Sequence, residues 1–177
     1  MERVAERLQR AEVVLRRWRL ADAPVVHGLV SGSIHHLAPW MPWAADGYTE
    51  RDARAFVERA QETWARGEEY DYAVVVPDAG IVGSCGLMAG TRCPEVGYWL
   101  AEPHCGRGIA TRAADMLVEE AFRIGAEAVE IVHDAANTAS GAVPRRLGFT
   151  EVERRPAPEP WTSGQQGTFV VWRRARG

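Results

Sequence analysis

Two hydrophobic periodicities alternate along the chain, and the points where one replaces the other predict the order of its elements. Short runs rich in β-branched and aromatic residues between turn signals predict strands, whereas apolar residues spaced three and four apart predict amphipathic helices. Strands are expected at 13–18, 70–76, 81–88, 96–100, 128–133 and 168–172, with a further strand starting at 148. Helices are expected at 22–35, 53–64, 109–124 and 137–147. The resulting order, β-α-α-β-β-β-α-β-α-β-β, indicates an α+β fold with a mixed sheet.

Local capping and turn signals support these boundaries. Asp22 is expected to be the N-cap of a helix that has a proline in its first turn, and the segment from Thr49 to Asp52 resembles a capping box. The short turn at 77–80 predicts antiparallel neighbours. Two prolines exclude an ordinary helix from 37–43, which is therefore expected to be a loop. The polar residues 1–11 are expected to form a helical arm outside a single domain at 12–177.

Length and composition are those of an ordinary globular domain. The chain has 177 residues, of which 46% are apolar and 25% charged, enough for one domain with its own core. A formal net charge of −3 argues against nucleic-acid binding. No apolar run is long enough to span a membrane, and the N-terminus has mixed charges without an apolar segment. We therefore expect a cytoplasmic protein, either a monomer or a homodimer.

Cysteine and lysine usage narrows the possible chemistry. The three cysteines, Cys85, Cys93 and Cys105, have no CxxC spacing, and no histidine nearby completes a tetrahedral set. Neither a zinc site nor a disulfide framework is expected, and we predict no metal cofactor. All 21 basic residues are arginine. A Walker A phosphate loop requires a lysine and is therefore excluded.

The segment between the predicted strand at 96–100 and the predicted helix at 109–124 carries the clearest functional signal. It reads Cys105-Gly106-Arg107-Gly108-Ile109-Ala110-Thr111. A glycine-bearing loop between a strand and a helix points several backbone N–H groups at one spot, where the helix dipole also favours anions. We expect a phosphate or pyrophosphate here, with Arg107 as an additional donor. A Rossmann site fits less well because its pattern needs glycine at Thr111, and a simple tight turn is the remaining interpretation.

This segment resembles the acyl-CoA pyrophosphate loop of the GNAT superfamily of N-acetyltransferases, written Q/R-x-x-G-x-G/A. Gly108 and Ala110 match the pattern, and Cys105 replaces its glutamine or arginine. Other segments are similar to the ribosomal-protein alanine acetyltransferase branch, namely Pro39-Trp40-Met41-Pro42-Trp43, Glu95-Val96-Gly97-Tyr98-Trp99-Leu100, Asn137-Thr138-Ala139-Ser140 and Leu147-Gly148-Phe149. The similarity covers residues 12–174. It implies a single-domain fold whose mixed, mostly antiparallel sheet is flanked by helices and splayed at the acyl-CoA site.

The resemblance implies that acetyl-CoA is the cosubstrate and that an amine attacks its thioester directly. No enzyme nucleophile is then needed, and Cys105 belongs to the structure of the loop. Ser140 becomes the candidate partner of the departing thiolate, because Pro144 occupies the place of a tyrosine that many members of the superfamily use. The candidate base is Glu95, with alternatives at Glu68, Glu69, Asp71, His133 and Asp134.

The cofactor contacts follow from the same resemblance. The pyrophosphate is expected on the backbone of 105–111, and the pantetheine arm along the backbone of Tyr98, Trp99 and Leu100. Asn137 is a favoured type of N-cap residue, and its amide is also expected to bond the pantetheine arm. Because proline has no N–H, Pro144 leaves the carbonyl of Ser140 without its helical donor, which predicts an irregular helix beside the site.

Aromatic residues are candidates for the wall of an acceptor pocket. Trp40, Met41 and Trp43 are expected on one side, and Trp161 on a mobile flap at 156–167, because aromatic rings can enclose a cation. The alternative is that the tryptophans of 40–43 cap the core. The acceptor is left open between a protein N-terminus, an amino-bearing antibiotic and a small amine. The alternative functions are a non-catalytic acyl-CoA-binding module and, less well supported, a nucleotide-binding oxidoreductase.

Overall fold

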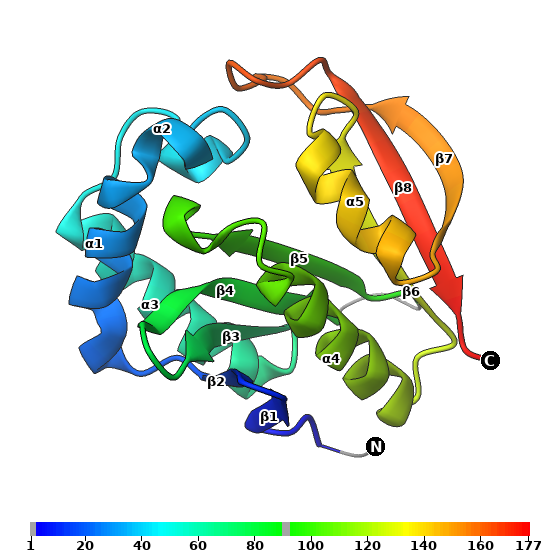
Figure 1. Ribbon diagram of the computed structural model, residues 1–177, viewed down its shortest axis with the longest axis horizontal. Helices are drawn as coiled ribbons and strands as arrows, with labels where there is room; N and C mark the ends of the chain where they lie inside the picture. Colours follow the sequence, from blue (N-terminus) through cyan, green and yellow to red (C-terminus); the bar gives the residue numbers. More distant parts are fainter. Residues whose placement is uncertain (1–2, 90–92) are drawn as a thin grey trace.

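One mixed sheet runs through the protein, with its strands in the order β1-β2-β3-β4-β5-β6-β8-β7 (Figure 1). The computed structural model describes residues 3–89 and 93–177. The strands are β1 (Arg7–Arg10), β2 (Val13–Arg17), β3 (Glu69–Val76), β4 (Gly80–Met88), β5 (Glu95–Leu100), β6 (Ala128–Asp134), β7 (Thr150–Pro156) and β8 (Thr168–Ala175). Neighbours are antiparallel except for β5 and β6, which are parallel. The predicted α+β fold with a mixed, mostly antiparallel sheet is confirmed.

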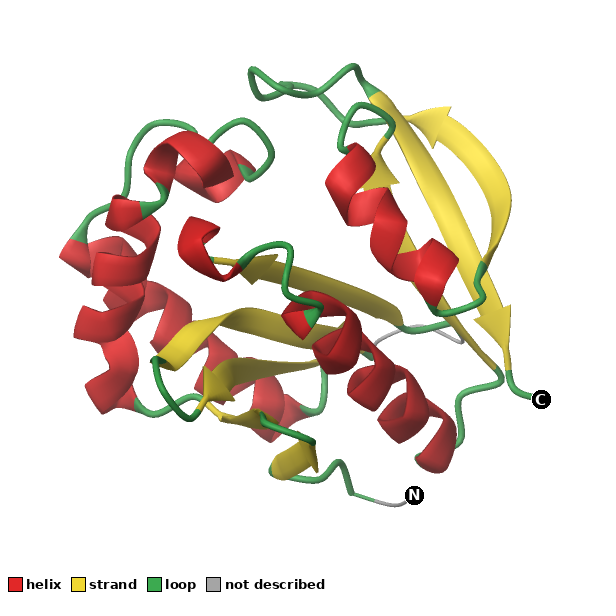
Figure 2. Cartoon of the chain, in the orientation of Figure 1, coloured by secondary structure: helices red, strands yellow, loops and turns green. Residues whose placement is uncertain are grey.

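Helices cover both faces of this sheet. They are α1 (Ala23–Gly32), α2 (Ile34–Leu37), α3 (Glu50–Arg66), α4 (Ile109–Arg123) and α5 (Thr138–Arg146), with short 3₁₀ turns at Leu20–Asp22, Pro42–Ala44 and Glu102–His104. α1 and α3 pack on one face, while α4 packs on the other against β2, β4 and β5. α5 packs against α4 and β6. Figure 2 shows how these helices enclose the sheet at its centre and leave β7 at its outer edge.

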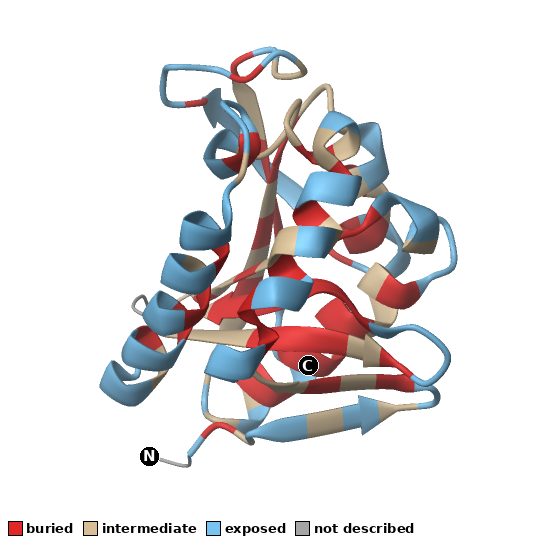
Figure 3. Ribbon diagram, turned by 90° about the vertical axis from the view of Figure 1, so that its left-hand side faces the viewer, coloured by how far each residue is buried: buried red, intermediate tan, exposed pale blue. Residues whose placement is uncertain are grey.

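Two groups of buried apolar residues hold the layers together. The larger lies between the sheet and α4 and includes Leu15, Leu87 and Leu117, each fully buried. The smaller lies under α1 and α3 and includes Val26 and Val57, also fully buried. Figure 3 shows buried residues along the sheet and the inner faces of the helices, with exposed residues on the outer faces. This sandwich of helix, sheet and helix leaves the sheet itself as the rigid support for a site.

The N-terminal segment differs from the expected helical arm. Residues 7–10 form β1, which pairs with β2 so that Leu8 lies opposite Leu15, and Leu8 packs against the larger core. The backbone N–H of Ala5 donates to the carboxylate of Glu120 at 2.6 Å. The expectation of a helix was wrong because the backbone of this segment finds its hydrogen-bond partners in β2 and Glu120. The local sequence pattern does not predict these partners.

The helix predicted at 22–35 is divided in two. α1 ends at Gly32, and Ser33 adopts a non-helical conformation before α2 begins. The Ser33 hydroxyl instead accepts a hydrogen bond from the backbone N–H of Glu102 at 2.9 Å. This bond ties the break in the helix to the segment that follows β5, which is the segment that begins the predicted anion loop.

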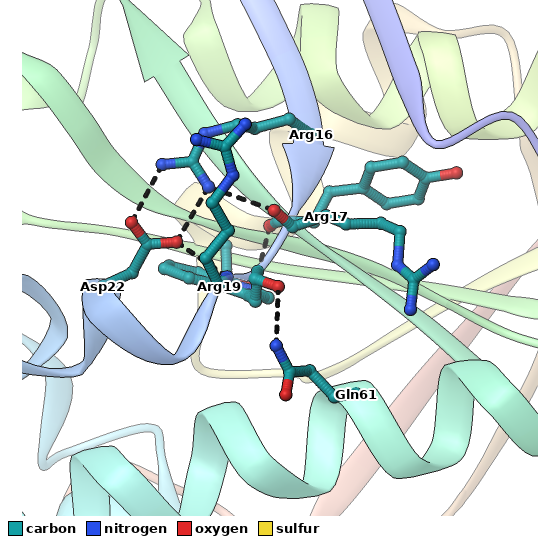
Figure 4. A network of polar contacts seen from close by, with 8 residues as sticks. Arg16, Arg17, Arg19, Asp22 and Gln61 are labelled. Carbon is teal, nitrogen blue, oxygen red and sulfur yellow. Dashed lines mark hydrogen bonds and ion pairs between the residues drawn. The ribbon is translucent and has the colours of Figure 1, made fainter.

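Asp22 is the N-cap residue of α1 as predicted, but its carboxylate does not cap that helix. It forms a two-pronged ion pair with the Arg16 guanidinium at 2.7 and 3.0 Å, and it accepts from the backbone N–H of Arg19 at 2.8 Å (Figure 4). Burial alone would raise the pKa of Asp22, but the Arg16 hydrogen bonds and the Arg19 N–H together lower it. The network fixes the junction between β2 and α1.

The capping box predicted at the start of α3 is confirmed. The Thr49 hydroxyl accepts from the N–H of Asp52 at 3.2 Å, and the Asp52 carboxylate accepts from the N–H of Thr49 at 2.8 Å. Gly67 ends the helix in a left-handed conformation with φ +72°. Because both ends of α3 are determined locally, the helix presents a defined face to the sheet.

Candidate active site

The sheet opens between β5 and β6. Within the described residues, the ladder between these parallel strands consists of one pair, Glu95 opposite Glu130. Beyond that pair the strands diverge, which leaves the β6-facing backbone edge of Tyr98, Trp99 and Leu100 without a ladder partner (Figure 1). The opening holds a cavity of ≈580 Å³ whose lining comes from both halves of the sheet, including Trp99 on β5 and Ser140 on α5. We call it the main cavity.

Aromatic side chains form one wall of the main cavity. Trp43 lies with its ring centroid 5.7 Å from that of Trp99 and 5.6 Å from that of Tyr48. Trp40 and Met41 also line the cavity, so the three residues expected near the acceptor from 40–43 are brought together there. Tyr48 was not singled out from the sequence, because it lies in a loop with no helical or strand periodicity to assign it a direction.

Trp161 does not lie in the main cavity. Its ring packs over Gly167, where a Cβ atom would come within 2.1 Å of it, and its Nε1–H donates to the carbonyl of Ala157 at 3.2 Å. The side chain remains 48% exposed. Gln165, which lies in the same loop between β7 and β8, lines the cavity instead.

The loop at 157–167 is anchored on both sides. The N–H of Gly164 donates to the carbonyl of Pro39 at 3.0 Å, and the Thr162 hydroxyl donates to the same oxygen. This places the loop beside the 38–49 segment, as Figure 2 shows at the top of the view. The buried Asp134 carboxylate accepts from the N–H groups of Gln166 and Gly167, each at 3.0 Å. The loop is therefore a tethered strap, and it contributes Gln165 to the lining of the cavity.

Replacing Asp134 with asparagine is expected to lower the free energy of unfolding by about 2 kcal/mol at pH 7, because hydrogen bonds to a buried charge are lost. Burial by itself raises the pKa of Asp134, but the backbone donors of Gln166, Ala136 and Gly167 lower it overall. A lowered pKa stabilises the fold above the carboxyl's unfolded pKa, and this contribution disappears as the pH falls below it. Urea unfolding should therefore show the difference shrinking below pH ~4.

The control for that measurement is Asp46→Asn, since Asp46 is exposed in the loop before α3. Equal stability of Asp134→Asn and wild type at pH 7 would contradict the anchoring role of the carboxylate.

Tyr98 and Ser140 meet across the opening. The Tyr98 hydroxyl donates to the backbone carbonyl of Ser140 at 2.9 Å, and the Ser140 hydroxyl donates back to the Tyr98 oxygen at 3.4 Å. That carbonyl is the one that Pro144 deprives of its helical donor, so a side chain from β5 supplies the missing hydrogen bond. α5 continues through Pro144 to Arg146. Burial raises the pKa of the Tyr98 phenol, which therefore stays protonated.

Asn137 caps α5 as expected, and its side-chain oxygen accepts from the N–H of Ser140 at 3.2 Å.

Both ring nitrogens of His133 are used in hydrogen bonds within the fold. Its Nε2 accepts from Trp172 Nε1 at 2.9 Å, so its Nδ1–H donates to the carbonyl of Asp134 at 2.7 Å. Burial lowers the pKa of His133. A Cβ on Gly141 would lie 2.7 Å from the imidazole, so glycine is needed where α5 crosses it.

The predicted anion loop has the expected geometry. Gly106 and Gly108 adopt φ of +73° and +75°, and Gly108 is the N-cap of α4. The first hydrogen bond of the helix joins the N–H of Arg112 to the carbonyl of Gly108, so the N–H groups of residues 109–111 lack helical acceptors. The exposed Cys105 thiol lies 3.4 Å from Nε2 of His36. Burial and Glu102 raise the pKa of this thiol, as expected for a structural cysteine rather than an activated one.

The candidate base from the sequence lies outside the main cavity. Glu95 lines a neighbouring cavity with Glu68 and Glu130, and burial and Glu130 raise its pKa. The two cavities share Arg59, Glu69 and Met88, which therefore lie between them. Asp71 lines the main cavity but not the neighbouring one.

No helix in the described ranges is long and apolar enough to cross a bilayer. Within the same ranges, no three His, Cys, Asp or Glu side chains gather as a metal site.

Comparisons with known proteins agree with this architecture. Residues 12–150 match the family model described as an acetyltransferase (GNAT) domain. "Putative ribosomal N-acetyltransferase YdaF" from Bacillus subtilis (strain 168) is 29% identical over 145 residues, which is 78% of each chain. A crystal structure of the Microcin C7 self immunity acetyltransferase MccE with acetyl-CoA and AMP has a TM-score of 0.85 at 20% identity over 94% of each chain. The ribosomal L7/L12 α-N-protein acetyltransferase RimL with coenzyme A has a TM-score of 0.85 at 22% identity over 98% of each chain.

Proposed function

This chain belongs to the acetyltransferase (GNAT) family, and from that premise we propose that it transfers the acetyl group of acetyl-CoA to a primary amine by direct attack on the thioester. The observation that carries the proposal is the main cavity, which passes through the opening between β5 and β6. It connects the Tyr98–Ser140 contact with the aromatic wall at Trp43 and Trp99. The cavity thus joins the end proposed for the donor to the wall proposed for the acceptor.

The residues on the donor side fit acetyl-CoA. Two glycines with positive φ and the free N–H groups at the start of α4 suit a pyrophosphate. The open backbone edge of Tyr98, Trp99 and Leu100 suits the amides of the pantetheine arm, which extends the sheet like a strand. The thioester then lies near the Ser140 hydroxyl, which hydrogen-bonds the departing thiolate. The Asn137 amide is a further donor to the arm.

The acceptor is a primary amine on a peptide N-terminus or a small molecule. The relatives support this choice. YdaF is named a putative ribosomal N-acetyltransferase and RimL a ribosomal L7/L12 α-N-protein acetyltransferase, whereas MccE is named for self immunity to a microcin. The aromatic wall of Trp40, Met41 and Trp43 suits the organic part of such an acceptor and can stack on a cation.

Calorimetric titration with acetyl-CoA, followed by assays of thiol release, tests this function. The acceptors are peptides with a free N-terminal serine or alanine, spermidine and an aminoglycoside, and the N-acetylated peptides are the matched controls. We expect saturable acetyl-CoA binding and thiol release with at least one free amine, but none with the blocked peptides. Binding without release would indicate a non-catalytic acyl-CoA-binding module, and absence of binding would refute the proposal.

A further inference from the structure

Asp71 places an unpaired carboxylate in the main cavity. It lies on β3, directly opposite Gly86 of β4, between the apolar positions that build the core. Among the described residues its side chain makes no hydrogen bond and no ion pair, although it is half-buried. A charged group in such surroundings is costly unless something compensates it. The fold keeps this carboxylate available for a ligand.

Glycines clear a path from this carboxylate to the opening in the sheet. A Cβ on Gly86 would lie only 2.2 Å from Asp71 Oδ1, so the carboxylate occupies the space of the missing side chain. Gly97 of β5 lies opposite Gly86 in the next pair of strands. The carboxylate therefore points over Gly86 toward β5, the next strand ~4.8 Å away. The Met88 methyl borders this path, 3.6 Å from where a Cβ of Gly97 would lie.

The other carboxylates near the opening are excluded one by one. Asp134 is saturated by backbone N–H groups from Ala136, Gln166 and Gly167. Glu95 lines the neighbouring cavity, which shares Arg59, Glu69 and Met88 with the main cavity. Asp52 and Glu69 also line the main cavity, but Asp52 accepts from the N–H and the hydroxyl of Thr49, and Glu69 is shared with the neighbouring cavity. Among the described residues, Asp71 is the carboxylate that lines the main cavity only and has free acceptor atoms.

The surroundings of Asp71 suit an organic cation. Trp43, Tyr48 and Trp99 enclose the same cavity, and their faces attract an ammonium group. At its rim α3 contributes one negative and one positive side chain, Asp52 and Arg59. The site thus combines a half-buried counter-ion with aromatic walls, which is the chemistry that recognises an alkylammonium.

We propose that Asp71 binds the ammonium of the acceptor and is the catalytic base that deprotonates it, an assignment that rests on the proposed function. One N–H proton moves to the Asp71 carboxylate, and the nitrogen lone pair then attacks the thioester carbon. As the C–N bond becomes an amide and the C–S bond breaks, the nitrogen loses a second proton and the thiolate gains one. The proton on Asp71 leaves to solvent, so one proton is released in each turnover.

The protonation state of Asp71 is compatible with this role. Burial raises its pKa to about 6, Glu69 on the same strand adds to the increase, and Arg59 on α3 opposes it. Cys85 on β4 is the other titratable neighbour, and burial together with Asp71 raises its pKa, so it stays neutral. Tyr48 and Asp52 face the same cavity. Asp71 is therefore ionised above pH ~6 and becomes inactive as the pH falls through that value.

The decisive comparison is between Asp71→Asn and Glu95→Gln, with Asp78→Asn in the exposed β3–β4 turn as the matched control. With the best acceptor of the panel above, Asp71→Asn should lower kcat/KM by about 100-fold or more and remove the limb of the pH profile near 6. Acetyl-CoA affinity should be unchanged. Normal turnover in Asp71→Asn, or the same loss in Glu95→Gln alone, would overturn the assignment while leaving the proposed function intact.

A binding measurement makes the test independent of the acceptor panel. Quenching of tryptophan fluorescence by n-butylammonium at pH 7.5 should be saturable for wild type and weakened about 10-fold or more in Asp71→Asn. Asp78→Asn should bind like wild type. Absence of saturable binding to wild type, or equal affinity in Asp71→Asn, would overturn the ammonium site even if acetyl-CoA binds normally.

Thermal unfolding separates loss of function from loss of fold. Because the pKa of Asp71 is raised in the folded state, its ionisation destabilises the protein above the unfolded pKa, most fully above pH ~6. Asp71→Asn should therefore raise Tm by about 5 °C at pH 8, with little difference at pH 4. A lower Tm at pH 8 would contradict the proposal that this carboxylate is held unpaired for a ligand.

Discussion

Gly108→Val will weaken acetyl-CoA binding by about 100-fold or more, because it alters the conformation of the N–H groups at the start of α4, where we propose that the pyrophosphate binds. Gly108 has φ +75°, where a β-branched residue is strained by roughly 1–3 kcal/mol. A Cβ there also lies 3.4 Å from the Arg112 guanidinium. Valine will therefore pull the turn toward negative φ and disperse the donors. Calorimetric titration of the folded variant measures the effect.

The matched control for this experiment is Gly125→Val. Gly125 follows the other end of α4, has φ +106° and has open space around it. It carries comparable backbone strain far from the loop, so it should lose stability without losing acetyl-CoA affinity. Unchanged affinity in folded Gly108→Val would remove the pyrophosphate from this loop, and an equal loss in Gly125→Val would attribute the effect to strain alone.

Tyr98→Phe will lower kcat by about 10-fold or more with little change in acetyl-CoA affinity, because the phenol positions Ser140, which we propose to act on the departing thiolate. Its hydroxyl donates to the Ser140 carbonyl at 2.9 Å and accepts from the Ser140 hydroxyl at 3.4 Å. Ser140→Ala should cause a similar loss. Since the two hydroxyls act as one unit, the double variant should be little worse than either single variant.

Tyr70→Phe is the matched control, since Tyr70 packs edge-on against Trp64, 5.1 Å away between ring centroids, on β3. Pro144→Ala offers a second test, because it restores an N–H that can bond the Ser140 carbonyl and compete with Tyr98. Additive losses in the double variant would show that the two hydroxyls act separately. Normal kcat in both single variants would leave Ser140 as a capping residue.

The candidate site was only partly readable in advance, and particular residues show why. The 105–111 loop could be recognised because glycine spacing, a preceding strand and a following helix are all local properties. The contact between Tyr98 and Ser140 could not, because Pro144 indicates only that a carbonyl lacks its donor, and the replacement comes from a strand 42 residues earlier. Trp161 had the aromatic character expected of a pocket wall, but its direction depends on its packing over Gly167.

The amino-acid sequence by itself determined the elements whose signals are local, among them the Thr49 cap, the antiparallel strands β3, β4 and β5, and the glycine turn before α4. Only the tertiary structure decided which carboxylate lines the main cavity without a partner among the described residues. Glu95 and Asp71 lie on the same face of the sheet, and strand alternation does not distinguish them. In the strand register, Asp71 lies opposite Gly86, which in turn lies opposite Gly97. Glu95 instead lies opposite Met88. A side chain's neighbours across strands depend on pairings between distant segments, and these are set by packing of the whole sheet.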